Sequence, residues 1–148
     1  MSLVPDGLHG MLRVGRSLIP GAGLGLFATE CVAANELLLA YGGRTITGSQ
    51  LAGALSAGET TGDYAVRVRR DLYIDAEHTP QHLARYINDA RGSPLRNNVE
   101  FVRVPSPGRL GGVELHLQTT RHVAAGHELL VSYGEPYWQM WYQRNSVL

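Results

Sequence analysis

Residues 83–91 read Leu-Ala-Arg-Tyr-Ile-Asn-Asp-Ala-Arg and place one asparagine, Asn88, within an apolar segment. The turn-rich run Gly92-Ser93-Pro94 follows, and Asn97-Asn98 then leads into Val99-Glu100-Phe101-Val102, whose composition is typical of a strand. An amide on an apolar segment, followed by a loop and a second amide, can present polar groups from a buried scaffold. This stretch is therefore the first candidate for a functional site.

The length and composition indicate one domain without a strong overall charge. The 148 residues suit a single core, and 13 basic residues (Lys and Arg) balance 13 acidic ones. This balance argues against direct nucleic-acid binding, and no stretch resembles a signal peptide or a membrane span. The single cysteine, Cys31, excludes an internal disulfide or a cysteine-built zinc cluster within this chain. We expect Cys31 in the core and a soluble, intracellular protein.

Short segments separated by turn residues predict a mainly β domain. The chain has 18 glycines, and residues 63–69 alternate between polar and apolar side chains as a half-buried strand does. The expected strands are 11–15, 37–41, 63–69, 72–75, 101–104, 113–119 and 129–133. Short helices are expected near 47–51, with Thr47 or Ser49 as the N-cap, near 82–88 and over 135–144. The six histidines show no metal-ligand spacing with cysteines or acids.

A second motif is the glycine run of residues 23–28, Gly-Leu-Gly-Leu-Phe-Ala. Its spacing fits the loose fingerprint of a dinucleotide-binding loop, which requires a helix directly after the glycines and an acid about 20 residues later. Residues 42–47 contain no acid, which argues against a nicotinamide cofactor. The alternatives are a plain turn between strands and a loop whose backbone approaches a ligand closely, which Gly23 and Gly25 would permit.

The glycine run, the 83–91 segment and residues 126–134, Gly-His-Glu-Leu-Leu-Val-Ser-Tyr-Gly, resemble in this order the motifs of the SET domain, a family of protein lysine methyltransferases. The resemblance covers residues 12–138 of one domain, 1–148, without a cysteine-rich segment on either side. The spelling of residues 85–91 is closer to the PR branch of the family, and Asp89 stands where the usual pattern has histidine. The implied fold is mainly β, with several small curved sheets, short helices and a pseudoknot-like C-terminal core.

The resemblance implies S-adenosylmethionine as the methyl donor, S-adenosylhomocysteine as the product, and no metal. The implied cofactor-binding residues are Gly23, Leu24, Gly25, Tyr64, Arg85, Asn88, Asp89, Asn98 and Trp138. Asn88 would offer its amide to the cofactor and Asn98 would close the pocket; alternatively, Asn88 caps a helix end and Asn98 begins a strand. Trp138 or Trp141 would stack on the adenine, or would only pack a terminal helix onto the sheet.

The resemblance also implies Tyr133 as the catalytic residue, with its hydroxyl directed at the site of methyl transfer. The implied walls of the substrate-lysine channel are Tyr41, Tyr64, Phe101, Val131 and Tyr137. Tyr64 is alternatively an ordinary aromatic residue of a strand. Many relatives have Phe or Tyr at the position of Val131, where it limits how many methyl groups are added, so the number of methyl groups stays open here.

The resulting hypothesis is an S-adenosylmethionine-dependent lysine methyltransferase, with a histone tail as the implied substrate and a chromatin-regulating role in the nucleus. The competing hypothesis is a catalytically silent SET or PR-like module that binds a partner peptide. Asp89 in place of histidine favours the silent module, whereas Asn88 and Tyr133 favour the enzyme. The sequence expects neither a nucleic-acid nor a membrane partner, and it leaves the target lysine and the oligomeric state open, a homodimer included.

Overall fold

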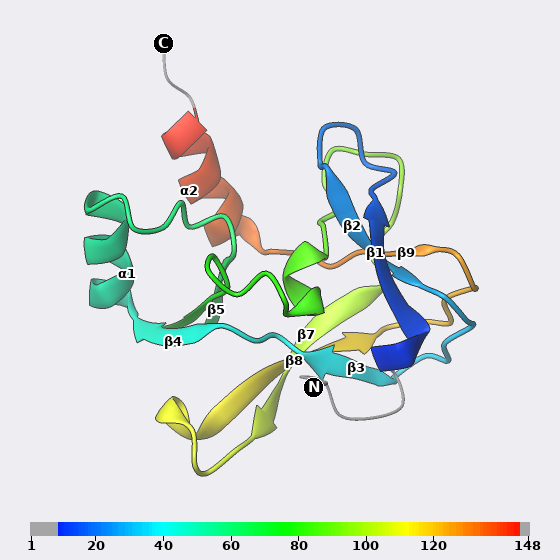
Figure 1. The fold of residues 1–148 in the computed structure, drawn as a ribbon, viewed down its shortest axis with the longest axis horizontal. Helices are drawn as coiled ribbons and strands as arrows, with labels where there is room; N and C mark the ends of the chain where they lie inside the picture. Colours follow the sequence, from blue (N-terminus) through cyan, green and yellow to red (C-terminus); the bar gives the residue numbers. More distant parts are fainter. Residues whose placement is uncertain (1–8, 146–148) are drawn as a thin grey trace.

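The computed structural model describes residues 9–145 and shows three small antiparallel sheets with short helices (Figure 1). The first sheet has the order β1 (Leu12–Arg16), β2 (Leu24–Ala28), β9 (Glu128–Leu129). The second has the order β3 (Leu37–Ala40), β8 (Val113–Thr119), β7 (Val99–Pro105), and the third β4 (Arg44–Thr47), β6 (Leu72–Asp75), β5 (Ala65–Arg69). The predicted mainly β class is confirmed.

Two α-helices and three 3₁₀ turns complete the described chain. The α-helices are α1 (Gly48–Ser56) and α2 (Glu135–Asn145), and the 3₁₀ turns are η1 (His9–Met11), η2 (Leu83–Tyr86) and η3 (Leu110–Gly112). Thr47 caps α1 with a full capping box, because its hydroxyl accepts from the Gln50 amide while the Gln50 side chain accepts from the Thr47 amide. None of the described helices is long and apolar enough to cross a membrane.

One hydrophobic core joins all three sheets. Leu26, Leu117 and Ile74 come from the first, second and third sheet respectively and are at most 2% exposed. The core also includes Ile87, so the segment of residues 83–91, called the central segment below, enters the interior at this residue. This placement puts the residues that follow Ile87 at the junction of the sheets, where segments distant in sequence meet.

One local expectation is wrong: Cys31 is exposed in the turn after β2 and does not pack in the core. The direction of the chain at a turn decides this, and a local pattern does not specify it. The glycine run leads into β2 and not into a helix, in line with the argument against a dinucleotide-binding loop.

The C-terminal segment packs between the central motif and β7. Leu130 forms a parallel bridge with Asn88, and Val131 forms one with Val99. The buried Asn98 side chain binds the same segment twice, donating to the Glu128 carbonyl at 3.0 Å and accepting from the Leu130 amide at 2.8 Å. Residues 128–131 are therefore held beside the segment that begins at residue 83.

Candidate functional site

A pocket of about 760 Å³ lies between the β1–β2 loop, the central segment and α2. Its size falls within the usual range of small-molecule sites, roughly 300–1,000 Å³. Seven of the nine residues predicted for the cofactor line it, namely Gly23, Leu24, Tyr64, Arg85, Asn88, Asp89 and Trp138. Segments far apart in sequence thus form one cavity, and the family resemblance had named part of its wall.

The β1–β2 loop supplies one side of this pocket with backbone. Gly23 has a φ of +76°, a conformation that favours glycine, and a Cβ at this position would meet no atom within 4 Å. Gly25 is different, because a Cβ there would collide with Oε2 of Glu128 and would lie 3.1 Å from its Cδ. Gly25 therefore accommodates a side chain of the protein itself, and it does not line the pocket.

Glu128 is a buried carboxylate that the sequence reasoning did not single out as functional. It accepts hydrogen bonds from the Ser17 hydroxyl at 2.7 Å and the Leu18 amide at 2.8 Å, and from the Asn88 side chain at 3.4 Å. It thereby fastens the β1–β2 loop to the central segment. The only signal in the sequence is its place in the third motif, two residues after Gly126.

The two predicted asparagines have different surroundings. Asn88 lines the pocket, and its side-chain amide donates to the Leu24 carbonyl at 2.8 Å, which fixes the end of the β1–β2 loop. Asn98 does not line the pocket, since both ends of its amide bind the backbone of residues 128–130. A contribution of Asn98 to ligand binding stays a prediction and would act through that backbone.

Arg85 and Tyr64 form a stacked pair in the pocket wall. The guanidinium carbon lies 3.9 Å from the centre of the Tyr64 ring, and Nη1 donates to the carbonyls of Ala76 and Glu77. Its Nε is buried and has no hydrogen-bond partner among the described residues. An unpaired buried donor on a cationic group fits a ligand that carries a carboxylate.

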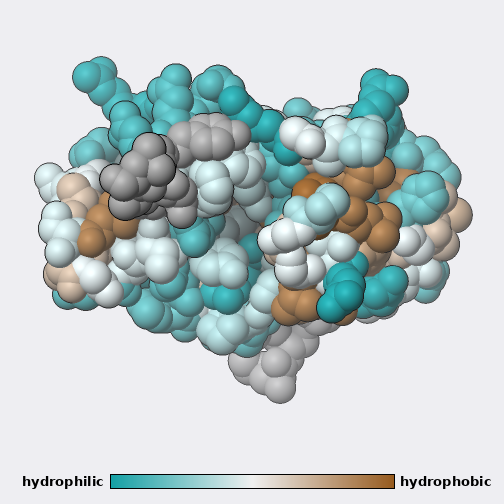
Figure 2. Space-filling model, turned by 90° about the horizontal axis from the view of Figure 1, so that it is seen from above, coloured by the Kyte–Doolittle hydropathy of each residue, from teal (hydrophilic) through white to brown (hydrophobic). Residues whose placement is uncertain are grey.

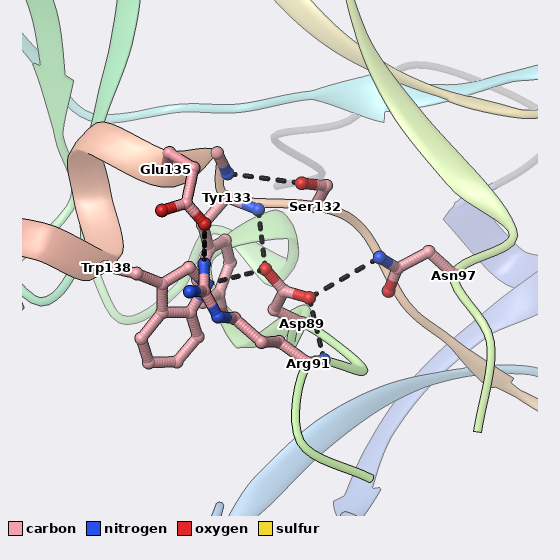
Figure 3. Close-up of polar contacts among 8 residues, drawn as sticks. Asp89, Arg91, Asn97, Ser132, Tyr133, Glu135 and Trp138 are labelled. Atoms are coloured by element: carbon pink, nitrogen blue, oxygen red, sulfur yellow. Dashed lines mark hydrogen bonds and ion pairs between the residues drawn. The ribbon is translucent and has the colours of Figure 1, made fainter. Parts of the chain in front are cut away.

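Asp89 connects the central segment to α2 (Figure 3). Its Oδ2 accepts from the Tyr133 amide at 2.9 Å and from the Trp138 indole at 2.8 Å. Trp138 thus places its indole edge on Asp89 while it lines the pocket, and Trp141 lines the same pocket. The sequence left open whether one of these tryptophans faces a ligand or both only pack α2 onto the sheet, and the structure brings both to the pocket wall.

The predicted catalytic tyrosine lies in an aromatic cluster. Its hydroxyl donates to the Ile87 carbonyl, and its ring lies 4.6 Å from that of Tyr137 and 5.8 Å from that of Trp138. Burial, reinforced by the Tyr137 phenol, raises the pKa of Tyr133 well above its ordinary value. Tyr133 is therefore a neutral hydroxyl at physiological pH, able to orient a partner but not to act as a phenolate base.

A second, smaller pocket of about 290 Å³ shares Tyr133 and Tyr137 with the first. Its lining is mostly apolar and comes from α1, from β5 and its neighbour β6, and from the start of α2. Arg67 of β5 is the charged residue in this lining. The two pockets therefore share a pair of tyrosines, Tyr133 and Tyr137, in their walls.

The remaining predicted channel residues pack behind these pockets. Tyr41 is buried, donates to the Tyr64 carbonyl at 3.0 Å and meets Phe101 edge-on at 5.9 Å between ring centres. Val131 is 1% exposed in the core. None of these three residues lines either of the two pockets, so their roles in a channel stay predictions.

Comparison with protein-family models gives a match. The sequence model of the SET domain family matches residues 23–134, a span that begins in the glycine loop and ends just after Tyr133. A search of curated proteins finds no match. Among residues 9–145, no group of three or more His, Cys, Asp or Glu side chains is placed to hold a metal ion.

Proposed function

Because the chain belongs to the SET-domain family, whose members are generally protein lysine methyltransferases, we propose that it is an S-adenosylmethionine-dependent protein lysine N-methyltransferase. The observation that carries this proposal is the pair of pockets whose walls share Tyr133 and Tyr137. A methyl donor in the larger pocket and a lysine entering through the smaller one would reach each other there. Alignment of two reactants in this way is the main catalytic task of a methyl transfer.

The residues of the larger pocket suit this cofactor. When bound, S-adenosylmethionine supplies a methyl group on a positively charged sulfur. We assign its carboxylate to Arg85, whose Nε is the unpaired buried donor. The indole faces of Trp138 and Trp141 suit the flat adenine, and the backbone of the glycine loop suits the polar parts of the ligand.

The tyrosines govern the state of the substrate lysine. A lysine attacks only as a neutral amine, and burial among aromatic rings lowers the pKa of an ammonium group. A nearby positive sulfonium acts in the same direction, so the proton leaves to solvent without a strong base. The neutral hydroxyl of Tyr133 is then available to orient the amine, and Tyr137 lines both pockets beside it.

The substrate would lie extended along β5. This strand is at an edge of its sheet, and an edge strand can pair with a peptide through backbone hydrogen bonds. Leu51 and Leu55 of α1 add apolar side chains to the lining of the smaller pocket, which suits small apolar residues beside the target lysine. We further propose a histone tail as the substrate and the nucleus as the location. Both proposals come from the family resemblance.

The test is methyl transfer from labelled S-adenosylmethionine to a panel of histones and to lysine peptides with apolar, acidic or basic neighbours, beside Tyr133→Phe. All 13 basic residues of these 148 residues are arginines, so lysine-bound label belongs to the substrate and not to the enzyme. We expect label on lysine, reduced about a hundredfold or more in the variant, in line with the loss of one oriented hydroxyl. Label of equal intensity in the variant, or label on residues other than lysine, would contradict the proposal.

A further inference from the structure

Asp89 is a buried carboxylate that receives four hydrogen-bond donors and no cationic partner among the described residues. It is 7% exposed. Oδ2 takes the Tyr133 amide and the Trp138 indole, and Oδ1 takes the Arg91 amide at 2.9 Å and the Asn97 side chain at 3.4 Å (Figure 3). A buried charge is tolerated only when its hydrogen-bonding capacity is met, and here donors alone meet it.

The chemistry of this site selects a carboxylate. An ionised aspartate only accepts, through two oxygens with about four lone-pair positions, and four donors converge on it. An asparagine would keep one accepting oxygen, and its NH₂ group would face two donors. A histidine would offer at most one accepting nitrogen. Neither substitute can hold both the Tyr133 amide and the Trp138 indole while it also holds the loop that follows Asp89.

The hydrogen bonds of the buried Asp89 side chain attach α2 to the rest of the protein. This helix also has polar contacts at the surface, among them an ion pair between Arg91 and Glu135 and a hydrogen bond from the Tyr137 hydroxyl to the Asp63 carbonyl at 3.0 Å. Exposed ion pairs contribute little, about 0–1 kcal/mol. Two of the groups that Asp89 holds, Trp138 and Tyr133, line the larger pocket.

We propose that Asp89 is a positioning residue that attaches α2 to the central segment and so sets the tryptophan wall of the larger pocket together with the backbone of Tyr133. The effect on the cofactor rests on the proposed function, whereas the attachment of α2 does not. Through Trp138 and Tyr133, Asp89 thus links the binding of the cofactor to the position of the tyrosine that orients the substrate lysine.

The attachment is tested by residue-resolved amide hydrogen exchange without any ligand, on the wild type, Asp89→Asn and Trp138→Phe. Glu30→Gln, at an exposed carboxylate in the turn after β2, is the matched control. We expect exchange in residues 133–145 to rise at least tenfold in Asp89→Asn and less in Trp138→Phe, which leaves the Tyr133 bond in place, while the core strands match the control. Unchanged exchange in α2, or an equal rise throughout the protein, would overturn the proposal.

The functional part is tested by calorimetric titration of the same four proteins with S-adenosylhomocysteine. We expect Kd to rise at least tenfold in Asp89→Asn and to stay unchanged in Glu30→Gln. Equal affinity in Asp89→Asn and the wild type would overturn the link to the pocket. If the wild type itself does not bind, the proposed function fails, and the exchange experiment still decides whether Asp89 attaches α2.

Discussion

Gly25 is a residue whose replacement the structure opposes. A Cβ at this position would collide with the Glu128 carboxylate, which is itself held by the Ser17 hydroxyl and the Leu18 amide and cannot move aside. We predict that Gly25→Ala lowers the free energy of unfolding by about 1–3 kcal/mol, the usual cost of overpacking. Urea unfolding measures the change. Gly10→Ala is the control, since its Cβ would meet no atom within 4 Å, and equal stability of the two variants would contradict the account.

Tyr41 and Tyr133 predict a loss of stability in alkali. Burial is the main cause that raises the pKa of both phenols above 10.0, their value in an unfolded chain. Above pH 10 the unfolded state releases protons that the folded state retains, so the free energy of unfolding falls as the pH rises. The slope is about 1.4 kcal/mol per pH unit for each such tyrosine.

Urea unfolding between pH 8 and pH 11 checks this prediction, with ~1 pH unit between samples. The Tyr41→Phe variant, which removes one of the two phenols, should show a flatter decline above pH 10 even though it starts from a lower stability. The same steepness in the variant and the wild type would show that Tyr41 is not the group that resists ionisation.

At this scale the sequence and its family resemblance identified part of the pocket wall but not the groups that hold it. Gly23, Arg85 and Trp138 were identified by motif, and all three line the pocket. Glu128, which occupies the space beside Gly25, was missed because its partners are distant in sequence. Ser17, for example, donates to Glu128 at 2.7 Å across 111 positions. A motif indicates which residues matter, whereas the hydrogen bonds that position them depend on the fold.

Helix α1 allows a test at the scale of the element. Its capping box at Thr47 satisfies backbone donors of the first turn, and Gly53 lies exposed in its interior with free space around a Cβ. We predict that Thr47→Ala costs about 1 kcal/mol and that Gly53→Ala gains about 0.5–1 kcal/mol. Thermal unfolding of the two variants measures opposite shifts in Tm, and shifts of the same sign would contradict this description of the helix.

The elements themselves were largely predictable. The capping chemistry at Thr47 and the polar–apolar alternation of residues 63–69 are local signals, and the structure has α1 and β5 there. The exposed positions of Cys31 and Leu18 were not predictable, because both residues follow strands in turns whose direction is set by distant partners. Apolar side chains also gather over part of the molecular surface (Figure 2).

At the scale of the whole molecule, residues 128–131 pack against segments distant in sequence, and the Asn98 side chain holds them with two hydrogen bonds. We predict that Asn98→Ala lowers the free energy of unfolding by about 2–4 kcal/mol, because it leaves a buried amide and a buried carbonyl of residues 128–130 without partners. Arg96→Ala, at an exposed position in the same loop, is the control. Chemical unfolding of both variants checks this, and a cost below about 0.5 kcal/mol for Asn98→Ala would contradict it.

The pairing of distant segments is the part of the fold that local patterns could not supply. β2 pairs with β9, and residues 88 and 99 bridge residues 130 and 131, across separations that no periodicity encodes. Alternation of polar and apolar side chains identifies a strand but not the strand with which it pairs. The expectation of a closely packed C-terminal core therefore came from the family resemblance, through three motifs in a fixed order.

The measurement that tests the central claim most directly is calorimetric titration of the wild-type protein with S-adenosylmethionine, because it requires no knowledge of the substrate. The account predicts one molecule bound per chain with a Kd in the micromolar range, and quenching of tryptophan fluorescence at the same midpoint, since Trp138 and Trp141 both line the pocket. Absence of binding at millimolar ligand by a protein shown to be folded would contradict the account and would favour a silent peptide-binding module.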